Sequence, residues 1–348
     1  MTTETPSITL PKRQHTLLLA MVKEFIASAE PVGSAQVAAR HQLGVRSAMV
    51  RNLAAELEDT GYLRQPHTSA GRVPTDRAFR YYVDHLSGAS RIGFEDRAQI
   101  EFHYSSGTRD MAEVLRDTPR LLSLLTGQAA LTTAPRLEAI TLEGVNFVRL
   151  RQSQVLAVFI VKSGATYNRI VDTDRDHQQA ELDRMARYLN ESLEGHTLEQ
   201  ARAWIEAELK HERASYDQFM HEALTIGGAI AGQVGRPELY VEGGLQAIEQ
   251  PEFEDRQRMR DLLRTLDDKS ALLELLEKVF ERDGLVVSIG SENDNPRLTS
   301  LSVVAASYAS GSTTLGGLAI VGPVRMDYDR VIPLVEYTAR ALTRVIEH

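Results

Sequence analysis

Residues 44–76 read GVRSAMVRNLAAELEDTGYLRQPHTSAGRVPTD, and this stretch decides the fold of the N-terminal part of the chain. Apolar residues recur here at i, i+3, i+4 and i+7 from Val50, which is the spacing of one buried helix face. We expect this helix to run from Ser47 to about Thr60. Gly61 ends it, because glycine readily adopts the left-handed conformation that follows many helices. The opposite face is small and polar, with no bulk to keep the helix out of a groove.

Two more helices are predicted before this one. The first spans residues 12–29, where leucine, methionine, valine and phenylalanine side chains recur on one face. Pro31 marks its end, because a proline keeps the preceding residue out of helical conformation. A second, short helix follows from Ser34 to about Arg40. A helix, a short helix, a glycine turn and a third helix within about fifty residues is the spacing of a helix-turn-helix.

The outer face of the third helix offers the chemistry that recognises base edges in the major groove of DNA. An amide suits adenine, a guanidinium suits guanine or a phosphate, and small apolar groups lie near thymine methyls. Asn52, Arg51 and Ala48 meet these three needs. The alternative, that they are ordinary solvated residues of a surface helix, is the commoner case for a lone arginine or asparagine. The predicted reading residues are Arg46, Ser47, Ala48, Met49, Arg51, Asn52 and Ala55.

A hairpin is predicted directly after the third helix. Residues 62–66 extend, residues 67–72 turn the chain back, and a further helix begins near Thr75. A hairpin in this position is a wing, whose turn contacts phosphates or the adjacent minor groove. The same residues also suit a plain surface turn, and the wing is preferred because it follows a helix-turn-helix. The predicted DNA contacts of the wing are His67, Thr68, Ser69 and Arg72.

Charge and composition restrict the partners. The chain has 348 residues and a formal net charge of −9, yet residues 1–86 carry ten Lys/Arg against eight Asp/Glu. A sequence-neutral DNA binder is basic throughout, so only this first quarter suits nucleic acid. The lack of cysteine excludes disulfides, thiolate zinc sites and a cysteine nucleophile. We see no apolar run near the ~20 residues needed to span a bilayer and no secretory signal, and therefore expect a cytoplasmic protein without membrane partners.

Strand-like patterns begin after the first domain. They fall in two blocks, residues 141–171 and 285–321, and a mainly helical stretch separates them. A last helix is predicted from about Asp327 to Ile346. Two strand-rich blocks around a helical stretch predict one α+β domain that is interrupted by an insertion.

Five stretches of the sequence are distinctive: the pair Arg51-Asn52 and residues 66–76 (PHTSAGRVPTD), 81–84 (YYVD), 250–253 (QPEF) and 325–328 (RMDY). On these stretches the sequence resembles the heat-inducible transcription repressor family, HrcA. The resemblance implies a homodimer that represses chaperone genes by binding an inverted-repeat operator in double-stranded DNA, assisted by a GroE-type chaperonin. It also implies a GAF-like fold for the split domain and a dimerising role for the insertion.

The expected fold class is therefore α+β and multidomain: an N-terminal winged helix-turn-helix, and a GAF-like α/β domain split by a helical dimerising insertion. Trp204, Ile205, Leu262 and Leu266 are the candidate dimer-interface residues, because an inverted repeat requires a two-fold symmetric reader. The expected boundaries are residues 1–88 for the winged-helix domain, 89–135 for a helical linker, 136–194 and 281–348 for the two parts of the GAF-like domain, and 195–280 for the insertion.

No arrangement typical of an enzyme stands out. The pair His211-Glu212 lacks the second histidine of a zinc-protease helix, and there is no lysine-bearing phosphate loop and no Gly-x-Ser-x-Gly elbow. We therefore expect a non-enzyme with no catalytic residue, no metal and no cofactor. The alternative function is a ligand-sensing regulator, in which a small molecule bound by the GAF-like domain sets the affinity for DNA.

Overall fold

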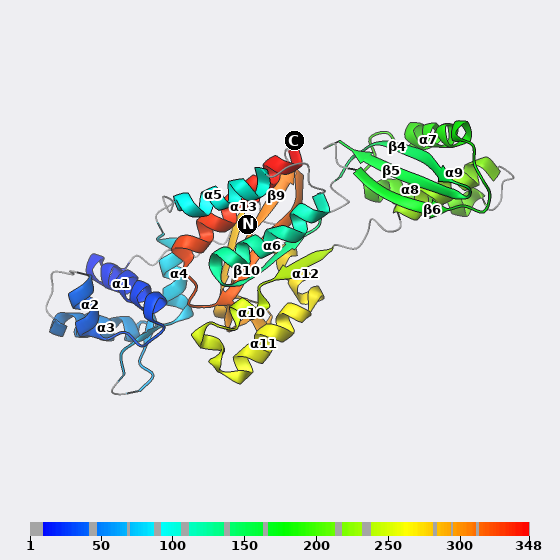
Figure 1. Ribbon diagram of the computed structural model, residues 1–348. Helices are drawn as coiled ribbons and strands as arrows, with labels where there is room; N and C mark the ends of the chain where they lie inside the picture. Colours follow the sequence, from blue (N-terminus) through cyan, green and yellow to red (C-terminus); the bar gives the residue numbers. More distant parts are fainter. Residues whose placement is uncertain are drawn as a thin grey trace.

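The computed structural model shows three bodies in a row (Figure 1): an N-terminal body, residues 10–86; a central body, residues 92–135 and 238–347; and an insert, residues 140–231, at the far end. No helix in the described part of the chain is long and apolar enough to cross a membrane. The described residues are 10–41, 47–67, 70–86, 92–105, 111–135, 140–162, 166–212, 218–231, 238–280, 284–293, 295–310 and 313–347.

The N-terminal body confirms the predicted order of helices and hairpin. Gly61 has φ +77°, and the Tyr62 amide donates to the Leu57 carbonyl, so glycine ends the third helix as expected. Thr75 precedes the fourth helix, but its hydroxyl donates to the carbonyls of Gly61 and Tyr62 instead of capping that helix. The elements are α1 (Lys12–Ser28), α2 (Ser34–Arg40), α3 (Ser47–Asp59), β1 (Leu63–Arg64), β2 (Val73–Pro74) and α4 (Asp76–Asp84).

The central body is one antiparallel sheet of five strands in the order β7-β3-β10-β9-β8. The strands are β3 (Ala129–Thr133), β7 (Leu239–Glu242), β8 (Leu285–Ile289), β9 (Leu301–Ser310) and β10 (Thr313–Pro323). The helices are α5 (Phe94–Ser105), α6 (Met111–Thr126), α10 (Gly244–Ala247), α11 (Arg256–Asp267), α12 (Lys269–Phe280) and α13 (Tyr328–Glu347), with short 3-10 helices at Pro251–Glu254, Gly290–Glu292 and Pro296–Leu298.

Helices cover both faces of the central sheet. Successive side chains of a strand point to opposite faces, and the two faces belong to two separate apolar clusters. Val304 and Leu318 share a cluster with residues of α6 and α13, whereas Val303 and Ala319 share one with residues of α11 and α12. All four side chains are buried.

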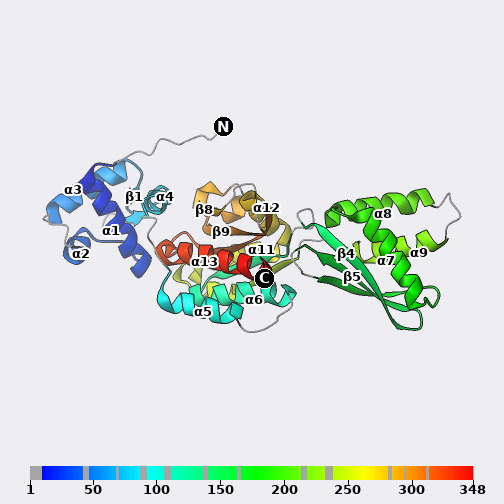
Figure 2. The same ribbon diagram turned by 90° about the horizontal axis from the view of Figure 1, so that it is seen from above.

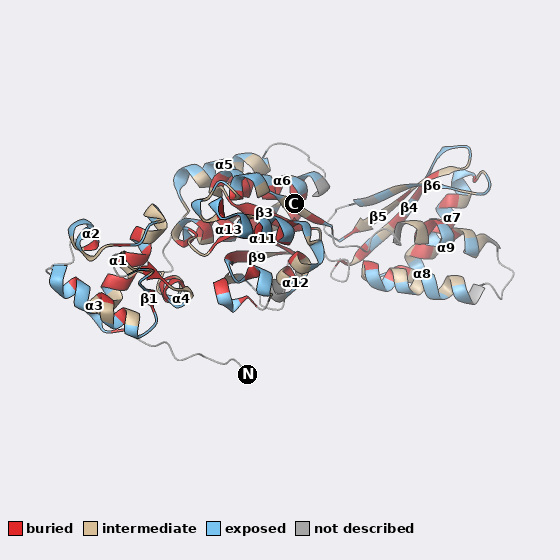
Figure 3. Cartoon of the chain, turned by 90° about the horizontal axis from the view of Figure 1, so that it is seen from below, coloured by how far each residue is buried: buried red, intermediate tan, exposed pale blue. Residues whose placement is uncertain are grey.

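The insert is a three-stranded antiparallel sheet, order β4-β5-β6, with helices on one face. Figures 2 and 3 show its three helices on the same side of the sheet. The central strand β5 alternates buried and half-buried residues along its whole length. The elements are β4 (Leu142–Arg151), β5 (Gln154–Val161), β6 (Thr166–Asp172), α7 (Gln179–Leu193), α8 (Leu198–Glu212) and α9 (Gln218–Ala231).

The expected domain boundaries differ from the observed ones. Strands β4–β6 pair only with one another and belong to the insert, whereas β3 and β7 complete the central sheet. Residues 89–135 are thus not a linker, and helices α11 and α12 lie in the central body instead of a helical insertion. The error has a physical cause, because β3 (AALTT) is buried throughout and β7 (LYVE) is very short. Neither shows the alternation that identifies a strand.

Candidate nucleic-acid interface

The outer face of α3 is exposed, and it gathers the predicted reading residues that the structure describes. Val50, Ala54 and Leu57 are buried against α1 and α2, so the opposite side of the helix is turned to solvent. Arg46 lies outside the described residues. The exposed reading residues are Ser47, Ala48, Met49, Arg51 and Asn52, and Ala55 is half-buried at the edge.

A buried carboxylate fixes α2 against α1. Glu24, on α1, is only 4% exposed. It accepts hydrogen bonds from Gln36 Nε2, at 2.7 Å, and from Arg40 Nη1, and His41 Nε2 lies 3.4 Å away. These contacts hold the two helices at one angle, which in turn orients α3. Sequence reasoning missed Glu24, although an acidic residue directly beside an apolar helix stripe is a usable signal.

The β1–β2 hairpin packs against the turn between α1 and α2. Val32 and Arg72 exchange backbone hydrogen bonds of 2.8 and 2.9 Å. A Cβ at Gly71 would lie 2.6 Å from the Pro31 carbonyl oxygen, so only glycine allows this close approach. Among the four predicted hairpin contacts, His67 is exposed, and Thr68 and Ser69 lie outside the described residues.

Arg72 is half-buried and pairs with a carboxylate of α3. Its side chain is 17% exposed, and its Nε donates to Glu58 Oε2 at 2.9 Å. The other oxygen of Glu58 accepts from the Gln65 amide at 3.0 Å, so this carboxylate ties the hairpin to α3. Arg64, on β1, is exposed instead. The alternation of β1 could have pointed to Arg64, whereas the Glu58 contact is visible only in the folded chain.

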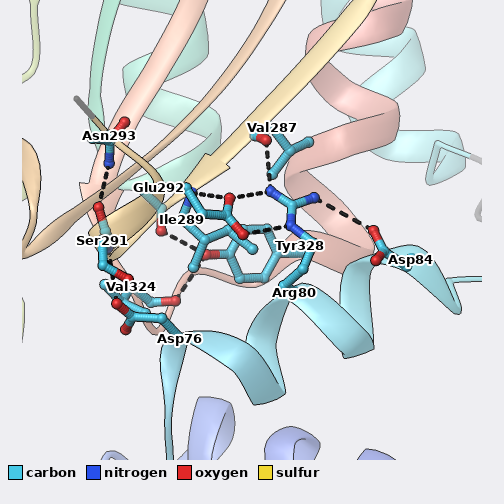
Figure 4. Close-up of polar contacts among 12 residues, drawn as sticks. Asp76, Arg80, Asp84, Val287, Ile289, Ser291, Glu292, Asn293, Val324 and Tyr328 are labelled. Carbon is cyan, nitrogen blue, oxygen red and sulfur yellow. Dashed lines mark hydrogen bonds and ion pairs between the residues drawn. The ribbon is translucent and has the colours of Figure 1, made fainter. Parts of the chain in front are cut away.

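Helix α4 joins the N-terminal body to the central body through polar contacts (Figure 4). Arg80 Nε donates to Glu292 Oε1, and its Nη2 donates to the Val287 carbonyl, both at 2.7 Å. Asp76 accepts from the Ser291 amide at 2.9 Å. Burial alone would lower the pKa of Arg80, but the hydrogen bond and the charge of Glu292 raise that pKa above its usual value. The guanidinium therefore stays charged while it holds the two bodies together.

A second contact between the same bodies lies beside the first. The Tyr82 hydroxyl donates to Asp329 Oδ2 at 2.6 Å, and Lys23 lies 3.2 Å from the same oxygen. Burial, and then the hydrogen bond to Asp329, raise the pKa of Tyr82, so it remains a neutral donor. These contacts join α4 and α1 to the start of α13.

The candidate dimer-interface residues do not form one surface. Trp204 and Ile205 lie on α8 in the insert, whereas Leu262 and Leu266 lie on α11 in the central body. Ile205, Leu262 and Leu266 are buried inside their own subunit. Trp204 is half-buried and packs beside Tyr188. The prediction is wrong for the three aliphatic side chains, because Leu262 and Leu266 belong to the apolar cluster on one face of the central sheet and Ile205 packs against α9.

The uncovered face of the insert sheet presents an apolar row. Val148 pairs with Leu156, and Leu156 pairs with Ile170, so one side chain from each strand meets on this face. Ile170 is 55% exposed, and Leu150 and Val148 are exposed as well. Apolar side chains gathered in this way on a surface mark an interaction site more often than isolated ones do.

Comparisons with known proteins match this chain to one protein family along almost its whole length. A family model described as the HrcA protein C terminal domain matches residues 112–332. The heat-inducible transcription repressor HrcA of Geobacter sulfurreducens is 39% identical over 338 residues, which cover 97% of this chain and 98% of that protein. The protein of the same name from Syntrophobacter fumaroxidans is 36% identical over 340 residues, with coverages of 97% and 98%.

A solved structure shares the fold. The crystal structure of a hypothetical protein superposes with a TM-score of 0.68 at 23% sequence identity, and the match covers 97% of this chain and 99% of that one. At this identity the likeness concerns the arrangement of helices and strands alone.

Proposed function

The chain belongs to the heat-inducible transcription repressor family, HrcA, and is a transcription repressor of heat-shock genes, and on this premise we propose that its N-terminal body is a winged helix-turn-helix that reads operator DNA. The observation that carries the proposal is the outer face of α3, which is exposed, small and polar. Its opposite face is anchored in a core, and Glu24 and Glu58 fix the neighbouring helix and hairpin.

In this proposal α3 enters the major groove. Asn52 and Arg51 contact base edges, and Ala48 lies close to the groove floor, where a larger side chain would keep the helix out. The hairpin is the wing, and Arg64 and His67 approach the flanking backbone. Arg72 is a positioning residue, because it holds the wing through Glu58.

Two copies of the chain are needed to read an inverted repeat. We propose that they meet through the open face of the insert sheet, along the row of Val148, Leu156 and Ile170. A dimer removes these side chains from water without disturbing the helix-covered side. The contacts of Arg80 and Tyr82 then carry the dimer geometry to the two copies of α3.

The remaining parts of the proposal follow from family membership. The central body is the GAF-like domain, the protein acts in the cytoplasm by blocking promoter access, and a GroE-type chaperonin assists its folding into the active dimer. A DNase footprint on chaperone promoters, with and without chaperonin, tests this part. A footprint on an inverted repeat that strengthens with chaperonin supports it, and an identical footprint without chaperonin contradicts it.

The docking of α3 is tested by fluorescence anisotropy on operator and scrambled duplexes. Asn52→Ala and Arg51→Ala are each expected to weaken operator binding by about 1–3 kcal/mol and to leave the scrambled duplex nearly unaffected. Arg187→Ala, an exposed arginine of α7, is the matched control. Operator affinity that is unchanged in both α3 variants would overturn the assigned face.

A further inference from the structure

Three side chains converge on the helix side of the insert, one of them buried and two half-buried. His177 lies in the turn before α7, Glu181 in the first turn of α7 and Glu222 on α9. One ligand-type atom of each lies within 4.8 Å of those of the other two. The sequence predicts no metal site here, because residues 177 and 222 are far apart and share no spacing motif.

The histidine is the group that points to a ligand. His177 is 2% exposed, and its Nδ1 makes no hydrogen bond in the described part of the chain. A buried polar atom without a partner costs free energy, so it calls for an explanation. The same Nδ1 is directed at the carboxylates, 3.4 Å from Glu181 Oε2 and 4.0 Å from Glu222 Oε2.

These separations suit a shared cation. Ligand atoms about 2.0–2.1 Å from a tetrahedral centre are about 3.3–3.4 Å apart. The pair His177–Glu181 already has that separation, the pair His177–Glu222 exceeds it by less than an ångström, and all three ligand atoms lie within 4.8 Å of one another. One imidazole nitrogen and two carboxylates are a donor set that zinc accepts, with a water in the fourth position.

In this structure the guanidinium of Arg175 occupies the position between the two carboxylates that a bound cation would take. Its Nη2 donates to Glu222 Oε2 at 2.7 Å and also to Glu181 Oε1, so it bridges the two carboxylates. Unlike His177, its side chain is 43% exposed and can turn into solvent without crossing the core. Exchanging one guanidinium charge for a divalent ion neutralises both carboxylates and gives the imidazole a partner.

We propose that His177, Glu181 and Glu222 form a binding site for a divalent cation of the zinc class, and that Arg175 occupies the cation's place until it is displaced. Such an ion joins the β6–α7 turn to α9, two segments on the helix side of the insert. The site is independent of the DNA-reading face of α3. The bound ion gives the insert a polar cross-link between these two segments, in addition to the packing of its apolar core.

The test is zinc binding by the full-length protein, measured by competition with a chromophoric chelator and by the shift in melting temperature. We expect one zinc ion per chain, and a rise in melting temperature that EDTA reverses. Glu222→Gln and His177→Gln should each lower zinc affinity more than about tenfold, since even outer partners of a metal ligand contribute 10–100-fold. Arg175→Ala should raise zinc affinity, because the competing guanidinium is gone.

Two features keep the experiment decisive. Because His177 is buried, the partly exposed Glu222→Gln is the variant expected to keep its fold, as circular dichroism can check. His196→Gln, in the turn before α8, is the matched histidine control and should bind zinc like the unaltered chain. Zinc binding that is unchanged in Glu222→Gln, or absent from both the unaltered chain and Arg175→Ala, overturns the site.

Discussion

The two sheets of this protein differ in how they are covered. The central sheet packs helices against both faces, and its alternating residues feed two separate clusters. The insert sheet packs helices against one face only and leaves Val148, Leu156 and Ile170 in a row on the other. A sheet that is closed on both faces is complete within one subunit, whereas an apolar face left open indicates a partner. The comparison thus separates the part that stabilises the subunit from the part suited to assembly.

The largest expected effect is on the closed sheet. Leu318→Ala removes a fully buried side chain of β10 and should lower the free energy of unfolding by about 2–5 kcal/mol. Ile170→Ala, on the open face, should cost the isolated subunit less than about 0.5 kcal/mol, because solvent already reaches this side chain. Urea denaturation at low protein concentration compares the two. Equal losses of unfolding free energy in the two variants would contradict the distinction between the closed and the open sheet.

The next effect concerns assembly. Ile170→Glu places a charge in the apolar row and should raise the dimer dissociation constant at least about tenfold, or about 1.4 kcal/mol. Sedimentation velocity over a range of concentrations measures it. Arg187→Glu is the control: it introduces a glutamate on the exposed side of α7, away from the apolar row, and should leave the dimer dissociation constant unchanged. A dimer that survives Ile170→Glu intact would place the subunit interface elsewhere.

A smaller effect is expected at the opposite end of the central body, where the interface between bodies is polar. Arg80→Ala removes the hydrogen bonds to Glu292 and Val287 and should weaken docking of the N-terminal body by about 1–2 kcal/mol. Hydrogen exchange at the Ser291 amide, which donates to Asp76, reports the docked state and should become about 5–30-fold faster. Arg80→Lys should give an intermediate exchange rate, because lysine keeps the positive charge but lacks the planar guanidinium that donates to Glu292 and Val287 together. Unchanged exchange would show that other contacts hold the bodies.

The smallest effect concerns α5, which packs against α13. A hydrogen bond from Tyr337, and then one from Arg344, lower the pKa of Glu101 below its usual value. The contribution of Glu101 to stability is therefore present above the unfolded-state pKa and is lost as the pH falls through the lower, folded-state pKa. Glu101→Gln should reduce stability slightly at pH 7, and the difference from the unaltered chain should vanish in acid. A difference that is constant with pH would contradict this assignment.

Sequence reasoning worked well wherever the signal was local. The limits of α1 and α3, the end of α3 at Gly61 and the two strand-rich blocks that hold β4–β6 and β8–β10 were predictable within a few residues. The exposure of the outer face of α3 followed from the same helical period that buries Val50 and Leu57. The pairing of Arg72 with Glu58 was not predicted, because this carboxylate lies 14 positions earlier in the sequence and reaches Arg72 only after the hairpin has folded.

The order of amino acids by itself determined most helices and strands, though not β3 and β7, together with their buried faces and the absence of thiol chemistry, because these depend on residue type and on periods of two or 3.6 residues. Only the tertiary structure decided which strands share a sheet, which face stays open and that His177 meets Glu181 and Glu222. The physical reason is that pairing between distant segments depends on the complementarity of two surfaces. A local pattern specifies one of those surfaces and leaves its partner undefined.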